Sequence, residues 1–266
     1  MPASGSVDQV DVPPAVHNVA AGRQVQPVWQ NEAGGLTFKV TGDAGSVFVK
    51  WQPAGSSVDL AAEAERLAWA GVFTPLPRVV GSGEDGDGTW LVTTEVLGQS
   101  AVTGRWRAEL ATAVRAIGEG LRAFHNSVPV ERCPFDWSAE ERVADAQRRA
   151  AVGLTTPEHW HPDHRGLTLH QALDLLTEAP PVDELVVCHG DACAPNTIVS
   201  DDGHWAGHVD LGAMGRADRW ADLAIATWST EWNYGPGWAS QLLTAYGVDD
   251  DNARTRYYRL LWDLGP

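Results

Sequence analysis

The chain contains little cysteine, methionine or lysine. Its 266 residues include 3 cysteines and 2 methionines, and the only lysines are Lys39 and Lys50, whereas the remaining basic residues are arginine. The cysteines form no CxxC pair, which argues against a disulfide framework and a zinc site. Because lysine is so rare, Lys39 and Lys50 stand out as positions where the chain has kept an amine either because it matters or by accident.

Long apolar runs and an excess of positive charge are also missing. No apolar run approaches the roughly 18 residues of a membrane-spanning helix, and the first residues lack the basic and apolar regions of a signal peptide. We therefore expect a soluble, cytoplasmic protein with no membrane partner. The formal net charge is −16, which argues against a nucleic-acid partner. It fits a cationic partner, because an acidic cleft concentrates positive ligands, although solubility alone would also explain it.

The pattern of apolar residues changes near residues 93–98. Before this point, β-prone stretches over residues 25–50 predict two or three antiparallel strands, followed by a helix over 56–71 and a strand over 89–98. Residues 1–16 are polar, contain proline and predict no regular element. After residue 98 the spacing is mostly helical. The sequence thus predicts an α+β chain with an N-terminal lobe (1–97, a small antiparallel sheet plus one helix) and a larger, mainly helical C-terminal lobe (98–266).

The strongest chemical signal is His189-Gly190-Asp191, followed by Asn196 and later by Asp210, which precedes a glycine. Phosphoryl transfer from ATP needs an aspartate that accepts the proton of the substrate hydroxyl, and an asparagine and a second aspartate that hold Mg²⁺. Oxygen ligands are what Mg²⁺ prefers. The pattern predicts Asp191 as the catalytic base and Asn196 and Asp210 as metal ligands. Taken singly, HGD is a common turn and DLG a common helix cap, but their order and spacing favour the functional interpretation.

A second signal is Lys50, at the end of the β-prone stretch SVFVK. Kinases place a strand lysine on the nucleotide phosphates and hold it with a helix glutamate. Glu63 is the candidate partner and Glu65 is its rival, because helix phase does not decide between them. The alternative is a solvated lysine at a strand end. The loop over residues 32–36, with Gly34, allows backbone N–H groups to approach phosphates, but glycine is common in strand turns.

Other patterns are assigned no catalytic role. Residues 81–86 match G-x-G-x-x-G, but their acidic residues and the strand that follows favour a hairpin turn. Cys193 has no indicated base and is interpreted as a packing residue. Four histidines lack the frame of a zinc site and are interpreted as surface residues: His159, His161, His164 and His170. Three tryptophans are candidates for lining a sugar site: Trp228, Trp232 and Trp238.

The segments VVCHGDACAPNTIV and HVDLGAMGRADRWADLAIA resemble the aminoglycoside phosphotransferases, as do VFVKW with EAERLAWA, and ERCPFDW. The resemblance extends over about residues 28–262. These enzymes have a two-lobed fold similar to that of protein kinases. They transfer the γ-phosphoryl group of ATP to a hydroxyl of an aminoglycoside antibiotic and so confer resistance. The resemblance implies the same fold and chemistry here, with ATP and Mg²⁺.

The resemblance also implies roles for individual residues. Asp191 is the base, Asn196 and Asp210 are the Mg²⁺ ligands, and Lys50 contacts the nucleotide phosphates while Glu63 holds it. The backbone around Thr93 and Glu95 receives the adenine, Asp222 braces the catalytic loop, and Arg216 touches phosphate or substrate. The chain departs from the family where Ala33 replaces a common serine, where Ala213 replaces a common arginine, and at Leu97-Gly98, where the hinge often reads Pro-Gly.

The C-terminal segment YYRLLWDLGP bears on the substrate. Family members that act on the 3′-hydroxyl of kanamycin and neomycin typically end in an acidic-aromatic stretch that binds drug amines. This segment, CPFDW and HGDxCxPN are more similar to the streptomycin 3″-phosphotransferases, so we expect streptomycin to be the substrate. Streptomycin carries guanidinium groups, which need carboxylates as binding partners. The candidate carboxylates are Glu231, Asp263 and, more weakly, Asp136. The alternatives are a 3′-phosphotransferase, a small-metabolite kinase of the same fold, or a nucleotide-binding protein without turnover.

Overall fold

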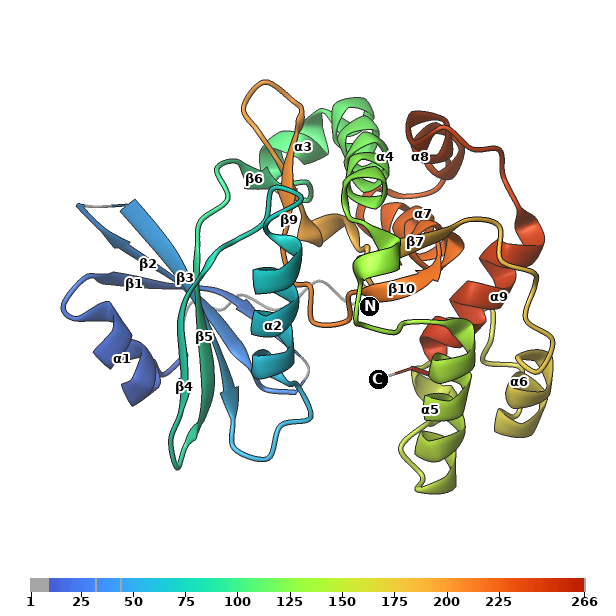
Figure 1. Cartoon of the computed structure of the whole chain (residues 1–266), viewed down its shortest axis with the longest axis horizontal. Coiled ribbons are helices and arrows are strands. Elements are labelled where there is room, and N and C mark those ends of the chain that lie inside the picture. The colour runs from blue at the N-terminus through green and yellow to red at the C-terminus, as the bar shows by residue number, and fades with distance from the viewer. Residues whose placement is uncertain (1–9, 32, 44, 266) are drawn as a thin grey trace. The chain divides into compact units, whose positions relative to one another are not determined.

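The computed structural model describes residues 10–31, 33–43 and 45–265 (Figure 1), so Glu32 of the predicted phosphate loop lies outside the described residues. The chain divides into two compact units. The first comprises Met1–Leu97 and His208–Gly212, and the second comprises Gly98–Gly207 and Ala213–Pro266. The short segment His208–Gly212 brings Asp210 into the first unit.

The first unit is built on a five-stranded antiparallel sheet. In spatial order its strands are β1 (Gln24–Gln30), β2 (Leu36–Gly42), β3 (Gly45–Pro53), β5 (Gly88–Thr94) and β4 (Val79–Glu84). Alternation along the strands separates the two faces. In β3, Val49 is buried on one face, and the next residue, Lys50, points to the other. Strands β4 and β5 form an antiparallel hairpin, but its turn is shorter than predicted: residues 81–84 belong to β4 and pair with β5, and only residues 85–87 connect the two strands.

Two helices cover opposite faces of this sheet (Figure 1). Helix α2 (Leu60–Ala70) begins after Asp59, whose side chain accepts a hydrogen bond from the backbone N–H of Ala62. It therefore starts four residues later than expected. Helix α1 (Pro14–Ala20) packs Val16 against apolar side chains of the sheet. The expectation of no regular element before residue 16 was wrong, because a proline at the first helical position suits a helix start.

The second unit is mainly helical. Its helices are α3 (Gly104–Ala108), α4 (Leu110–Ser127), α5 (Ala139–Ala151), α6 (Leu169–Leu175), α7 (Trp220–Tyr234), α8 (Ala239–Tyr246) and α9 (Asn252–Asp263). Short strands form two small sheets: β7 (Leu185–Cys188) pairs with β10 (Gly215–Asp218), and β8 (Thr197–Val199) lies between β6 (Gln99–Ser100) and β9 (Trp205–His208). The predicted α+β class, with a small N-terminal antiparallel sheet and a helical C-terminal part, is confirmed.

Helix α7 forms the centre of the second unit. Every residue from Trp220 to Thr230 is buried, including the polar Asp222, Thr227 and Ser229. A helix that is buried on all sides must pair its polar groups with protein atoms, and those atoms belong in part to the loop after β7. None of the helices described is both long and apolar enough to cross a membrane.

Candidate active site

Lys50 is anchored between two carboxylates in the first unit. Its Nζ lies 2.6 Å from Oε1 and 2.8 Å from Oε2 of Glu63, and 2.8 Å from Oδ1 of Asp210. Glu63 is 3% exposed, whereas the rival Glu65 is exposed on the outside of α2. Burial alone would lower the pKa of Lys50, but the negative charges of Asp210 and Glu63 outweigh it and raise that pKa above its ordinary value. The ammonium group is thus held in its charged form.

Asp210 has an unusual backbone conformation. Its φ is +67°, in the left-handed region, which residues other than glycine rarely adopt. Such conformations persist where the surrounding structure imposes them, and they concentrate at functional sites. The side chain is 49% exposed, so its carboxylate is open to solvent while one oxygen contacts Lys50. This combination suits a metal ligand.

The second lysine lies on the same face of the sheet as the first. Lys39 is paired across the strands with Phe48, which precedes Lys50 by two residues, so these three side chains share one face. Nζ of Lys39 lies 2.7 Å from Oε1 of Glu95 and 5.9 Å from the centre of the Phe48 ring. Both lysines of the chain are therefore tied to glutamates on one surface.

The other residues predicted to contact the nucleotide lie on or beside this sheet. Thr93 is buried in β5 and pairs with Phe48, and Glu95 follows β5 directly. Gly34 has a φ of +80° in the turn between β1 and β2, where the backbone N–H of Gly35 bonds to the side chain of Asn31 at 2.6 Å. The structure thus places Gly34, Thr93 and Glu95 in the unit that contains Lys50.

The loop after β7 carries Asp191 in the second unit. Its shape depends on Gly190, which has a φ of +85° and approaches residue 213 so closely that a Cβ would lie 2.2 Å from the Ala213 carbonyl oxygen. No other amino acid fits this position without movement. The side-chain Nδ2 of Asn196 donates hydrogen bonds to the backbone oxygen and to Oδ2 of Asp191, both at 3.0 Å. Asn196 therefore orients the Asp191 carboxylate directly.

A buried carboxylate fixes the start of this loop. Asp222, in α7, accepts hydrogen bonds from the backbone N–H groups of His189 at 2.6 Å and Gly190 at 3.0 Å. Its Oδ2 also lies 3.0 Å from Nε2 of His125, whose Nδ1 lies 2.8 Å from the hydroxyl of Tyr246. Burial would raise the pKa of Asp222, but the hydrogen bond and charge of His125, with further help from His189, lower it below its ordinary value.

The series of hydrogen-bonded side chains that leads from Tyr246 through His125 to Asp222 was not predicted from the sequence. His125 lies in the last turn of α4 and is isolated in an amphipathic pattern, so nothing local marks it. His125, Cys188 and Asp222 form a compact buried group, in which burial raises the pKa of the Cys188 thiol well above its ordinary value. Both carboxylate oxygens of Asp222 and Nε2 of His125 already take part in hydrogen bonds, two of which hold the loop, so we interpret the group as a brace for the loop.

The candidate substrate residues lie in the second unit. Arg216 is exposed on β10, and its backbone contacts the segment around Asp136. Glu231, in α7, lies 3.4 Å from Arg259, and Asp263, the last residue of α9, lies 2.6 Å from His164. The two strongest acidic candidates are thus already engaged with basic side chains of this chain.

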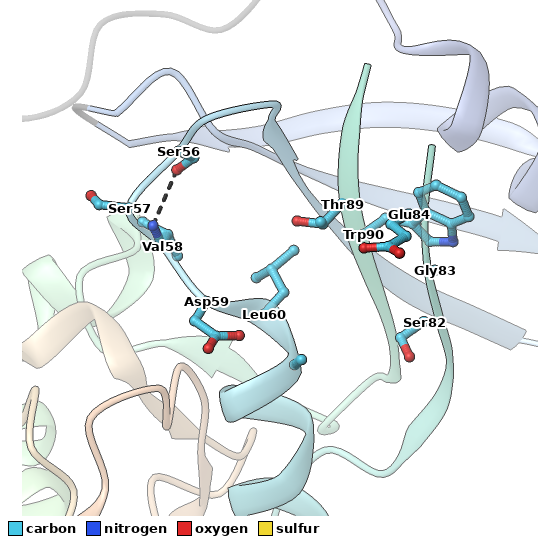
Figure 2. Close-up of a pocket in the computed structure, with 11 residues that line it drawn as sticks. Ser56, Ser57, Val58, Asp59, Leu60, Ser82, Gly83, Glu84, Thr89 and Trp90 are labelled. Carbon is cyan, nitrogen blue, oxygen red and sulfur yellow. Dashed lines mark hydrogen bonds between the residues drawn. The ribbon is translucent and has the colours of Figure 1, made fainter. Parts of the chain in front are cut away.

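A separate hollow of about 520 Å³ opens beside the first turn of α2 (Figure 2). Its lining includes Ser82, Gly83 and Glu84 of the hairpin, together with Asp59 and Thr89, and contains neither lysine nor arginine. Two carboxylates without a basic group repel phosphates. This hollow is therefore not a second phosphate site, which agrees with the interpretation of residues 81–86 as a hairpin.

The chain is similar in sequence and in structure to known phosphotransferases. The model of the phosphotransferase enzyme family matches residues 26–258. An aminoglycoside 3′-phosphotransferase of Streptomyces fradiae is 38% identical over 79% of this chain and 81% of its own length. A streptomycin 3″-kinase of Streptomyces griseus is 33% identical over 87% and 88%. The structure of aminoglycoside phosphotransferase APH(3″)-Id from Streptomyces rimosus superposes with a TM-score of 0.78, at 28% identity and over 94% and 95% of the two chains.

Proposed function

The chain belongs to the aminoglycoside phosphotransferases, within the phosphotransferase enzyme family, and on this basis we propose that it transfers the γ-phosphoryl group of ATP to an aminoglycoside hydroxyl. One observation carries the proposal: Lys50 is held between Glu63 and Asp210 in its charged form. A fixed ammonium of this kind is what positions nucleotide phosphates in kinases. The APH(3″)-Id structure with ADP and streptomycin supports the nucleotide as cosubstrate.

The nucleotide is proposed to lie on the sheet face that carries both lysines. Lys50 contacts its phosphates, and the turn at Gly34 supplies backbone N–H groups. The backbone at Thr93 and Glu95 receives the adenine. These positions share one unit and follow the surface of β2, β3 and β5.

Asn196 and Asp210 are proposed to hold Mg²⁺. Their donor chemistry fits, because each offers a side-chain oxygen: Asn196 bonds to Asp191 through its nitrogen, and Asp210 is half exposed. When bound, Mg²⁺ neutralises charge on the transferring phosphoryl group.

Asp191 is proposed to accept the proton of the attacking hydroxyl. Its carboxylate is oriented by Nδ2 of Asn196, and the loop behind it is anchored to Asp222. In a loose transition state the nucleophile loses its proton late, so position matters more than basicity. The protein therefore contributes mainly by fixing the hydroxyl relative to the phosphoryl group.

The proposal also concerns which aminoglycoside is the substrate and which of its hydroxyls receives the phosphoryl group. The 3′-hydroxyl is supported by the S. fradiae relative, and the streptomycin 3″-hydroxyl by the S. griseus relative, the S. rimosus structure and the C-terminal segment. The sequence predicts streptomycin as the substrate. Streptomycin and the kanamycin-type drugs are all cationic, in keeping with the net charge of −16. Arg216, Glu231 and Asp263 are the proposed contacts, and the cytoplasm is where ATP is available to the reaction.

Coupled measurement of ADP release tests the proposal. We expect release to be stimulated by streptomycin or by kanamycin and neomycin, to be abolished by EDTA and to be restored by Mg²⁺. The position of the phosphate on the product, read by NMR, identifies the hydroxyl. Stimulation by choline alone would instead indicate a small-metabolite kinase, and binding of ATP without ADP release would refute enzymatic function.

A further inference from the structure

The carboxylate of Asp263 is held at one oxygen only. Oδ2 accepts a hydrogen bond from the backbone N–H of His161 at 3.0 Å and lies 2.6 Å from Nδ1 of His164. Among the described residues none forms a hydrogen bond or ion pair with Oδ1, and this atom is not completely buried. The side chains of Asp263 and His164 are only 10% and 14% exposed. The result is a rigid anion with one oxygen left for a ligand.

Aromatic packing fixes the two histidines. The ring of His161 lies 4.3 Å from the ring of the buried Trp228, and the ring of His164 lies 5.8 Å from it. Trp228 in turn packs against Trp232 at 5.0 Å. Burial lowers the pKa of His161, although Asp163 and Asp263 oppose that effect. Aromatic packing thus holds the two residues that bind the carboxylate, and the carboxylate itself is largely buried, which strengthens its interaction with a cation.

Glu231, the other acidic candidate, lacks this arrangement. It faces the permanent cation Arg259, whose guanidinium lies 5.2 Å from the Trp228 ring and also hydrogen-bonds to oxygens of α7. A ligand cation at Glu231 would have to compete with Arg259. At Asp263 the partner side chain is an imidazole, which donates a hydrogen bond even when it is neutral.

We infer that His164 is a positioning residue that presents Oδ1 of Asp263 to a cationic group of the aminoglycoside. The inference rests on the proposed function, and it assigns a role to a histidine whose sequence pattern indicated only a surface position. His164 does not touch the substrate. It acts by restricting the carboxylate to one orientation, so that no rotamer freedom is lost when the cation binds.

Steady-state kinetics with the intact enzyme tests the role of His164. The substrate is whichever of streptomycin, kanamycin and neomycin stimulates ADP release most. We expect D263N to raise the KM for the drug about tenfold, because a charge-assisted hydrogen bond is lost, and to leave the KM for ATP near the wild-type value. H164A should raise the drug KM about threefold, and H164Q, whose amide N–H still donates, should recover most of it. Adding H164A to D263N should have no further effect, since both act through one carboxylate.

The chain offers a matched control in the His170–Asp174 pair, in which the two atoms lie 3.4 Å apart and the histidine is 86% exposed. H170A should leave both KM values unchanged. If H164A lowers the melting temperature but not the drug affinity, His164 only tethers its loop to α9 and the inference is wrong. If H164A fails to fold, H164Q and D263N decide. Wild-type protein that phosphorylates no aminoglycoside would refute the proposed function, and this inference with it.

Discussion

Replacing Asp222 by alanine removes the acceptor that holds the start of the catalytic loop. The backbone N–H groups of His189 and Gly190 and the imidazole of His125 all lose their partner in a fully buried position. A buried donor without an acceptor costs about 1–3 kcal/mol. With two such amides and the lost bond to His125, we expect D222A to lower the free energy of unfolding by about 4 kcal/mol.

This loss is large compared with the total stability of about 5–15 kcal/mol that is typical of proteins. For a chain of this size it corresponds to a fall in melting temperature of roughly 8–16 °C. Urea unfolding followed by tryptophan fluorescence measures the change in free energy. Hydrogen exchange at the amides of His189 and Gly190 localises it, since both amides should exchange faster in the variant. A loss below about 1 kcal/mol would show that the network in α7 does not anchor this loop.

The same carboxylate predicts a pH dependence. The folded-state pKa of Asp222 is lowered, so its contribution to stability is present above the ordinary aspartate pKa of about 3.9 and is lost as the pH falls through the folded value. Wild-type stability should therefore decline more steeply in acid than that of D222A. D174A is the matched control, because Asp174 pairs with His170 on the exposed surface of α6. The D174A substitution should lower the free energy of unfolding by less than about 1 kcal/mol.

Three further predictions concern the candidate site. D191A should abolish ADP release while leaving the affinity for ATP, measured by calorimetry, nearly unchanged; loss of ATP binding would contradict the role of Asp191 as base. K50M should lower kcat/KM about 100-fold, because a fixed charge on the phosphates is lost, and E63Q should have a smaller effect, since Asp210 still contacts the lysine. G190A should lower the melting temperature by several degrees, as expected for about 2 kcal/mol of backbone strain and contact with Ala213; an unchanged value would show that the loop relaxes.

The sequence predicted those parts of the fold and site that have a local signature. The strands around Lys50 and the change to helical spacing after residue 98 are local patterns, and the predicted class of fold followed from them. The spacing from Asp191 to Asn196 is also a short pattern, and it marked both residues as candidates. Helix α1 was missed because only three of its seven residues are buried, which is too few for periodicity to show. The choice between Glu63 and Glu65 needed the packing of α2 on the sheet.

Long-range pairs were out of reach for a different reason. His125 and Asp222 are 97 residues apart, and His164 and Asp263 are 99 residues apart. Neither histidine lies in a motif, and each acquires its role only when a distant helix brings a carboxylate to it. The sequence showed Asp263 as an acidic residue near the C-terminus, but which of its oxygens is engaged depends on the loop that carries His161.

The scarcity of lysine has a practical consequence once the positions of Lys39 and Lys50 are known. Both side-chain amines of the protein lie on one face of the first sheet, each beside a glutamate. A reagent that acylates amines therefore has no lysine side chains to modify elsewhere, and labelling at Lys39 and Lys50, read separately from labelling of the N-terminal amine, reports on that single surface. Mass spectrometry of the labelled protein would turn this compositional bias into a built-in probe of whatever covers the sheet.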